Sequence, residues 1–308
     1  MVTKKEVGKS AAALVRRIIL GAAMIGIVIS SVYLINTYVV EPYKSTENSG
    51  AEITVNEDNT ETTKSAESGD TVLAKYSELL KVNSDFVGKL YIDVIKEPEM
   101  NVVQCDNNDK YLTVGFNGET TRYGTPFVDF RNNIKDLNTN TTIYGHNMVN
   151  GREFGLLPKY KEIEVYREHP TIKFNTIYRD CTWKIFASFV INTKSYHDNG
   201  YIFPYRIINF PSEQKFLEFI DDVKSRSYYI NDTVDIVPGD KILTISTCCY
   251  DFDDERFVLM ARLVRDGESE DVNVKAAKKN ENQRFPQIWY DNKGQKNPFK
   301  DAVNFSIS

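Results

Sequence analysis

A run of 23 residues without a charged side chain, residues 18–40, constrains this chain more than any other feature of its sequence. As an α-helix such a run is about 34 Å long, which is enough to cross the hydrocarbon core of a bilayer. Five Lys and Arg residues precede the run. This excess of positive charge predicts that residues 1–17 lie in the cytoplasm, that residues 18–40 form a single-pass anchor in the cell membrane, and that the rest of the chain is extracellular.

A cleaved signal peptide is the alternative interpretation of the same run. The apolar core of a signal peptide is usually about 7–15 residues long and ends in a cleavage site of small residues. The run here is longer, and it leads into Tyr38-Val39-Val40-Glu41-Pro42. Its length therefore favours an uncleaved membrane anchor.

Residues 41–71 differ in composition from the chain around them. They hold five hydrophobic residues, and eight acids against two lysines. Such a segment buries too little apolar surface to offset its ordering entropy, so we predict a flexible extracellular linker. Apolar residues become frequent after it, which predicts a folded domain over 72–266 and a C-terminal tail over 267–308, with a docked helix as one form that the tail could take.

Short segments rich in β-branched and aromatic residues, separated by turn residues, fill most of the folded domain. This pattern predicts a mostly β fold with a few helices, closed or half closed into a barrel. The predicted strands are 90–94, 125–130, 141–144, 171–174, 182–191, 234–237, 242–247 and 256–264.

Helical patterns are few. Apolar residues share one face over 72–80, and Phe216, Phe219, Ile220 and Val223 repeat at helical spacing after Pro211-Ser212. A polar helix is predicted over 272–282. The aromatic residues of 284–290 either pack on the barrel or contact a partner, and packing is the favoured interpretation.

Composition excludes several functions. The net charge of −5 has the wrong sign for a broad nucleic-acid surface. Four Cys without zinc-ligand spacing predict neither a disulfide scaffold nor structural zinc. The acidic turn at 251–255 lacks the Gly and the distant Glu of a calcium loop, so a solvated turn is favoured. We expect no nucleic-acid partner, no metal and no cofactor.

Cys248 is the best candidate for a nucleophile. It ends an apolar strand in which Thr244, Ser246 and Cys248 alternate on one face, whereas Cys249 points to the other. An ordinary cysteine has a pKa of about 8.5, and a neighbouring cation stabilises its thiolate. Arg256 begins the next strand and could return beside Cys248, where it would also stabilise an oxyanion. Cys105 and Cys181 are predicted to be buried small hydrophobic residues.

The chain has three His residues, and each could in principle act as a base. His169 and His197 stand in segments that predict surface turns. His146 follows a predicted strand that ends in Gly145, so its imidazole should project from the end of that strand, where a barrel would open. A histidine that is merely satisfied at the start of a loop is an equally good interpretation of this position alone.

The residues around these candidates resemble the signature of sortases. The similarity rests on Thr244-Ile245-Ser246-Thr247-Cys248 with Arg256 eight positions later, and on Tyr144-Gly145-His146-Asn147-Met148 upstream. Other segments resemble class B sortases, the membrane-anchored cysteine transpeptidases of Gram-positive bacteria, in order and spacing. They are Val87-Gly88, Val102-Val103-Gln104, Tyr111-Leu112, Phe116-Asn117-Gly118, Gly124-Thr125-Pro126-Phe127 and 151–155.

The resemblance implies an eight-stranded sortase barrel with the active site at one end. Cys248 would attack the Thr carbonyl of an NPxT-like or PPxT-like sorting signal, His146 would act as acid and then base, and Arg256 would orient the signal and stabilise the oxyanion. Asn108, Leu112 and Ser246 would bind the signal. The implied partners are surface proteins that carry the C-terminal signal and an amine of a peptidoglycan precursor or cross-bridge.

Three alternatives remain open. A cysteine hydrolase would pass the same acyl group to water, and a tethered wall-binding module would not use the thiol at all. Pilin polymerisation is less favoured, because no Asp-Pro lid segment precedes the predicted barrel.

Cys249, directly after Cys248, raises the question of which sulfur reacts, and the alternation of the strand favours Cys248.

Overall fold

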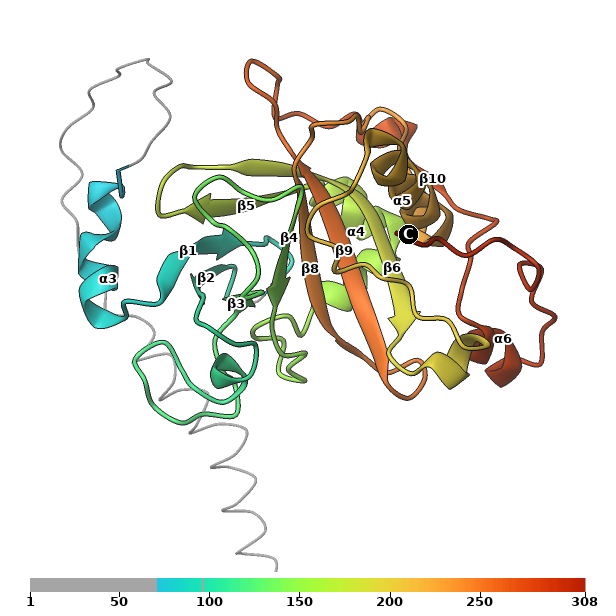
Figure 1. Cartoon of the computed structure of the whole chain (residues 1–308), viewed down its shortest axis with the longest axis horizontal. Coiled ribbons are helices and arrows are strands. Elements are labelled where there is room, and N and C mark those ends of the chain that lie inside the picture. The colour runs from blue at the N-terminus through green and yellow to red at the C-terminus, as the bar shows by residue number, and fades with distance from the viewer. Residues whose placement is uncertain (1–70, 96, 308) are drawn as a thin grey trace, which may run out of the picture. The chain divides into compact units, whose positions relative to one another are not determined.

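The centre of the computed structural model, which describes residues 71–95 and 97–307, is a closed barrel of eight strands. The strands follow the order β1-β2-β3-β4-β8-β9-β6-β5 around the barrel (Figure 1). They are β1 (Phe86–Tyr91), β2 (Glu99–Val103), β3 (Phe127–Val128), β4 (Asn140–Tyr144), β5 (Thr171–Thr176), β6 (Thr182–Asn192), β8 (Ile242–Cys249) and β9 (Glu255–Leu263). The predicted mostly β barrel is confirmed.

Two pairings in the barrel are parallel, β2 with β3 and β4 with β8. The other neighbours are antiparallel, including the hairpin of β8 and β9. The parallel pairing of β4 with β8 brings the ends of two strands that are distant in sequence to the same edge of the barrel.

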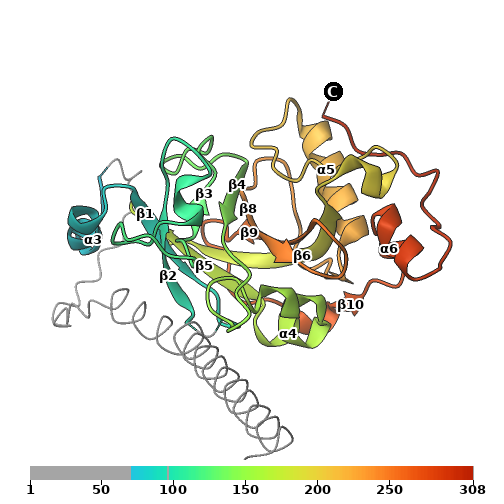
Figure 2. The same ribbon diagram turned by 90° about the horizontal axis from the view of Figure 1, so that it is seen from below.

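The strands β6, β8 and β9 are buried on both faces. Along β9, Phe257, Leu259 and Ala261 belong to the main core cluster, whereas Val258 and Met260 belong to a second cluster beneath helix α5 (Glu213–Arg226). This two-sided burial explains why apolar residues occur on both faces of these strands instead of on one face only. Figure 2 shows α5 beside β6.

Helix α5 begins and packs as its sequence predicts. The Ser212 hydroxyl accepts a hydrogen bond from the backbone N–H of Lys215, which caps the first turn. The predicted apolar face, which consists of Phe216, Phe219, Ile220 and Val223, is buried. The predicted N-terminal helix is also confirmed, as the 3₁₀ turn η2 (Ala74–Tyr76) followed by α3 (Ser77–Val82).

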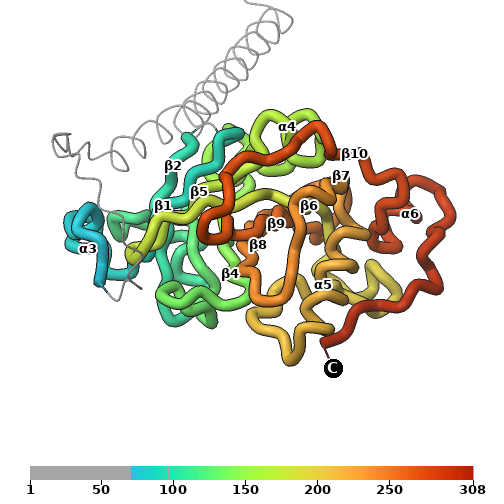
Figure 3. Tube along the Cα trace, turned by 90° about the horizontal axis from the view of Figure 1, so that it is seen from above, coloured from blue at the N-terminus to red at the C-terminus, as the bar shows by residue number. Residues whose placement is uncertain are grey.

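The remaining elements are short. They are η3 (Lys110–Leu112), η4 (Leu157–Lys161), α4 (Ile163–Glu168), η5 (Ser195–Asp198), β7 (Tyr229–Ile230), η6 (Val274–Ala276), β10 (Lys278–Lys279) and α6 (Gln287–Asn292). In the tail, β10 pairs with β7 outside the barrel (Figure 3). Phe285 and Tyr290 are buried, and Trp289 stacks on Phe285 with ring centroids 3.9 Å apart.

Three local predictions are wrong, and one strand of the barrel has no counterpart among the predicted strands. The first strand lies at 86–91 rather than 90–94. The unpredicted strand is β2, in which Glu99 and Asn101 interrupt the apolar residues. Residues 234–237 form no strand, because their apolar residues Val234 and Ile236 pack beneath α5 instead of joining a sheet. Residues 272–282 form η6 and β10 instead of a helix, because β7 offers a free edge with which β10 pairs.

None of the helices formed by the described residues is long and apolar enough to span a membrane. The predicted cytoplasmic N-terminus, the anchor over 18–40 and residues 41–70 of the predicted linker lie outside the described residues.

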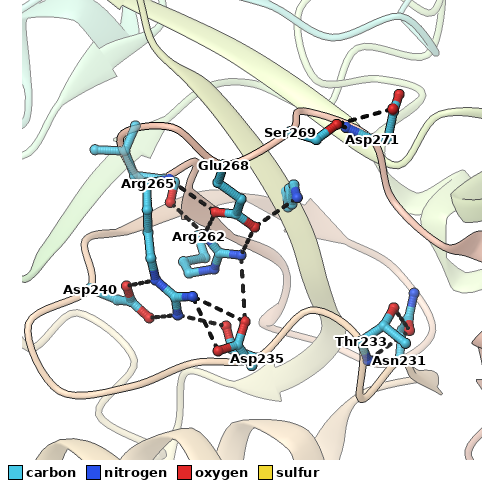
Figure 4. Close-up of polar contacts among 11 residues, drawn as sticks. Asn231, Thr233, Asp235, Asp240, Arg262, Arg265, Glu268, Ser269 and Asp271 are labelled. Carbon is cyan, nitrogen blue, oxygen red and sulfur yellow. Dashed lines mark hydrogen bonds and ion pairs between the residues drawn. The ribbon is translucent and has the colours of Figure 1, made fainter.

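A charged network joins the end of β9 to the start of the tail (Figure 4). The fully buried Arg262 donates to both carboxylate oxygens of Glu268, at 2.6 and 2.7 Å, and Lys184 donates to the same carboxylate at 2.8 Å. Arg265 binds Asp240 through two hydrogen bonds of 2.8 Å. The guanidinium of Arg262 holds the pKa of Glu268 well below its usual range.

Replacing Glu268 by alanine is therefore expected to lower the free energy of unfolding by about 3 kcal/mol, because it leaves a buried guanidinium without its main partner. Chemical denaturation of the full-length variant measures this. Asp271→Ala is the matched control, because Asp271 is an acidic residue three positions further along the chain that is exposed and contacts Ser269. We expect its free energy of unfolding to change by no more than about 0.5 kcal/mol. Equal free energies of unfolding for the two variants would contradict the inference that Glu268 is the main partner of the buried Arg262.

Candidate active site

The parallel pairing of β4 and β8 places His146 and Cys248 at one end of the barrel. Tyr144 is the partner of Ser246 in the register, and both candidates follow two residues later. The Asn147 amide donates to the Cys248 carbonyl oxygen at 2.7 Å, which ties the two strand ends together beyond the ladder. The sequence placed each residue at a strand end, and the pairing brings those ends together.

Arg256 lies directly beside Cys248. The two residues are partners in the antiparallel register of β8 and β9, and the Arg256 Nη1 lies 3.1 Å from the Cys248 Sγ. A guanidinium at this distance stabilises a thiolate and can donate to an oxyanion that forms on a carbonyl attacked by the sulfur. The hairpin predicted from the sequence thus delivers the cation to the thiol.

His146 is held by its backbone and by its ring. Its Nε2 lies 2.7 Å from the Leu112 carbonyl oxygen, and because a carbonyl only accepts, Nε2 is the donor. The backbone N–H of Phe154 donates to the His146 carbonyl at 2.9 Å. A Cβ at Gly145 would lie 2.7 Å from the Phe154 ring, so glycine is required before the histidine.

A pocket of about 470 Å³ opens at this end of the barrel. All six residues predicted from the sequence line it: Asn108, Leu112, His146, Ser246, Cys248 and Arg256. The Asn108 carboxamide oxygen accepts from the backbone N–H of Phe130 at 3.0 Å, and Leu112 is 38% exposed. Ser246 is buried, and its hydroxyl lies 3.0 Å from the Tyr205 hydroxyl.

Sequence reasoning missed the opposite wall of the pocket. Thr193, Ile202, Tyr205 and Arg206 line it, and they belong to the irregular stretch between β6 and α5. Asn199-Gly200 and Pro204 identified this stretch as a loop, but no periodic pattern showed that it folds over the end of β8.

A buried carboxylate supports the pocket from behind. The Tyr144 hydroxyl donates to Asp129 Oδ2 at 2.8 Å, and Arg131 Nη2 donates to the same oxygen at 2.8 Å. Burial alone would raise the pKa of Asp129, but these hydrogen bonds outweigh it and bring the pKa to about 2. The carboxylate thus stays charged and fixes the Tyr144 ring at the pocket.

Cys249 is in a different environment from Cys248. It is 6% exposed and belongs to the main core cluster, and burial raises the pKa of its thiol to about 11. The Lys161 ammonium lies 3.2 Å from its sulfur and 2.6 Å from Asp251 Oδ2. Cys249, Asp251 and Glu255 offer ligand atoms within 4.8 Å of one another, and the Lys161 ammonium contacts two of the three, Cys249 and Asp251.

The other candidates lie away from the pocket. His169 ends α4 and approaches Asp93 at 3.3 Å. His197 lies in the 3₁₀ turn η5, and the prediction that it is a surface residue is wrong, because the residue is only 9% exposed and its ring packs against Phe252. Cys181 is buried as predicted, whereas Cys105 is only half-buried.

The sortase domain family matches residues 90–264, which is more than half of the chain, so this chain belongs to the sortase domain family. The match includes every strand of the barrel from β2 to β9 and all six predicted pocket residues.

The chain is similar to class B sortases. The chain is 33% identical to Sortase B of Staphylococcus aureus over 63% of this chain and 76% of that protein. It is 33% identical to Sortase B of Listeria monocytogenes over 61% and 73%. A solved Staphylococcus aureus sortase B–substrate complex matches with a TM-score of 0.57 at 30% identity, over 64% of this chain and 87% of that chain.

Proposed function

We propose that this chain is a cysteine transpeptidase that cleaves a C-terminal sorting signal at a Thr carbonyl and transfers the protein to a cell-wall amine. The observation that carries the proposal is the 3.1 Å contact of Arg256 Nη1 with Cys248 Sγ in a pocket that His146 also lines. A thiol, a base and a cation at one pocket are the groups that acyl transfer needs.

The first step forms a thioester. The proton of the Cys248 thiol passes to His146, and the resulting thiolate attacks the Thr carbonyl carbon. A C–S bond forms, and the negative charge on the oxygen is stabilised by Arg256. The C–N bond then breaks, and His146 gives its proton to the leaving amine. In the second step an acceptor amine attacks the thioester, His146 takes the proton of that amine, and the Cys248 thiolate leaves.

The substrates follow from the same chemistry. An NPxT-like or PPxT-like signal would lie along Asn108, Leu112 and Ser246, and the acceptor would be an amine of a peptidoglycan precursor or cross-bridge. With an anchor over 18–40 the chain would be a single-pass membrane protein with its catalytic domain outside the cell, where surface proteins and wall precursors meet. A solved sortase B is complexed with triglycine, so this peptide is a suitable first acceptor to test.

A cysteine hydrolase is the competing function, because water could reach the same thioester. The test mixes the detergent-solubilised full-length chain with quenched NPxT-like and PPxT-like peptides, with and without triglycine, and follows the products by mass spectrometry. We expect a peptide joined to triglycine through its Thr.

The outcomes separate the alternatives. Cleavage without joining at saturating triglycine would identify a hydrolase. A chain that neither cleaves nor captures any of these peptides would be a binding module, and the proposal would be wrong.

A further inference from the structure

One wall of the pocket comes from residues 193–206, here called the wall segment, which have little regular structure. Its one helical turn is η5, and Asn199 and Gly200 after it have φ values of 53° and 93°. Ile202 and Tyr205 of this segment line the pocket. An irregular stretch of this kind keeps one conformation only if other parts of the molecule restrain it.

The C-terminal residues 284–307, here called the brace, contact the wall segment at two places. At the start of α6 the backbone N–H of Gln287 donates to Asp198 Oδ1 at 2.8 Å. Near the end of the chain the Tyr201 hydroxyl donates to the Phe305 carbonyl oxygen at 3.0 Å. The brace lies past residue 264, where the matched family domain ends.

Apolar packing reinforces the second contact. Phe305 is 8% exposed, and its ring centroid lies 6.4 Å from that of Phe203 in the wall segment and 5.7 Å from that of Phe219 in α5. Lys215 of α5 donates to the Ser306 carbonyl oxygen at 2.9 Å. Figures 2 and 3 both show the chain end lying beside α5.

Buried charges fix the brace in this place. Arg284 of the brace and Arg226 of α5, which are 8% and 1% exposed, share the carboxylate of Asp222 at 3.1 and 3.3 Å. The Arg226 guanidinium also lies 4.7 Å from the centre of the Phe203 ring. Displacing the brace would remove one of the two guanidinium partners of the Asp222 carboxylate, so the ion pair holds the brace against α5. Helix α5 in turn packs on Phe203 of the wall segment, because the Phe203 ring stacks on Phe219.

We propose that the brace is a positioning element for the sorting signal: it holds the wall segment in the conformation that binds the peptide. This inference rests on the proposed function. The brace touches none of the reacting groups, so its effect should fall on peptide binding and not on the thiol. If only a fraction of the molecules keeps the wall segment in place, the apparent affinity for the peptide is the intrinsic affinity multiplied by that fraction.

Phe305→Ala in the full-length chain tests the proposal. We expect KM for the signal peptide to rise about tenfold while kcat changes by less than about twofold. Alkylation of Cys248 by iodoacetamide should keep its rate, because this small reagent does not need the wall. Amide hydrogen exchange at 199–207 should become faster. Val303→Ala, at a side chain that is 92% exposed in the same brace, is the matched control and should leave all values unchanged.

A second variant covers the case in which Phe305→Ala does not fold. Tyr201→Phe removes only the hydroxyl that reaches the brace, and we expect it to raise KM about twofold or more with the same pattern of exchange.

Two results would overturn the proposal. A lower melting temperature with unchanged KM and unchanged exchange at 199–207 would make the brace a stabilising element only, and a slower alkylation of Cys248 would mean that it acts on the thiol. Failure of the wild-type chain to process any peptide would instead refute the proposed function, and hydrogen exchange would still decide whether the brace restrains the wall segment.

Discussion

Replacing Cys248 by alanine is expected to abolish both peptide cleavage and joining, with kcat falling by roughly 10⁶-fold. The reason is that no other thiol lines the pocket of the described structure, and the thioester cannot form without one. Mass spectrometry of the full-length chain with a signal peptide measures the loss directly, because the covalent adduct of the wild type should be absent from the variant.

Cys249→Ala is the matched control for this experiment. The Cys249 sulfur lies in the core, and its pKa of about 11 keeps it protonated near neutral pH, so it should not react with peptide or iodoacetamide. The variant should keep wild-type kcat/KM to within about threefold, since the change removes one buried atom. Adduct formation that persists in Cys248→Ala and disappears in Cys249→Ala would reverse the assignment of the nucleophile.

Replacing Arg256 by alanine is expected to lower kcat/KM by about 10²–10³-fold, the usual cost of losing one oxyanion donor. The change removes the guanidinium that lies 3.1 Å from the Cys248 sulfur, so alkylation of Cys248 at neutral pH should also slow. Steady-state kinetics together with iodoacetamide labelling measure the two effects separately.

Arg256→Lys separates charge from geometry. A lysine keeps the positive charge but not the planar guanidinium with its paired N–H donors. Relative to Arg256→Ala, the rate of Cys248 alkylation should therefore recover more than the rate of peptide turnover does. Wild-type turnover in Arg256→Ala would show that the guanidinium has no part in the reaction.

The catalytic candidates could be found from the sequence because each stands at a strand boundary with a readable pattern. The alternation of a strand predicts that Ser246 and Cys248 share one face and that Cys249 lies on the other. In the structure Ser246 and Cys248 line the pocket, and Cys249 belongs to the main core cluster. Gly145 identified the end of the strand before His146. Short-range patterns of this kind depend on the period of a strand and on turn chemistry, which are local properties.

The wall of the pocket could not be predicted in the same way. Tyr205 reaches Ser246 across 41 positions of sequence, and its neighbours have no helical or strand period. The prediction of a strand at 234–237 is wrong for a related reason. A short run of apolar residues does not indicate whether these residues join a sheet or pack beneath a helix.

Residue type and local periodicity were enough to predict the barrel class, helix α5, the face of β8 that lines the pocket, and the candidates for a thiol, a base and a cation. The three-dimensional fold was needed to show that β4 pairs with β8 in parallel, that the wall segment lines the pocket, and that the brace contacts this wall segment. These features depend on contacts between residues far apart in the chain, such as Tyr201 with Phe305, and on the burial that such contacts create.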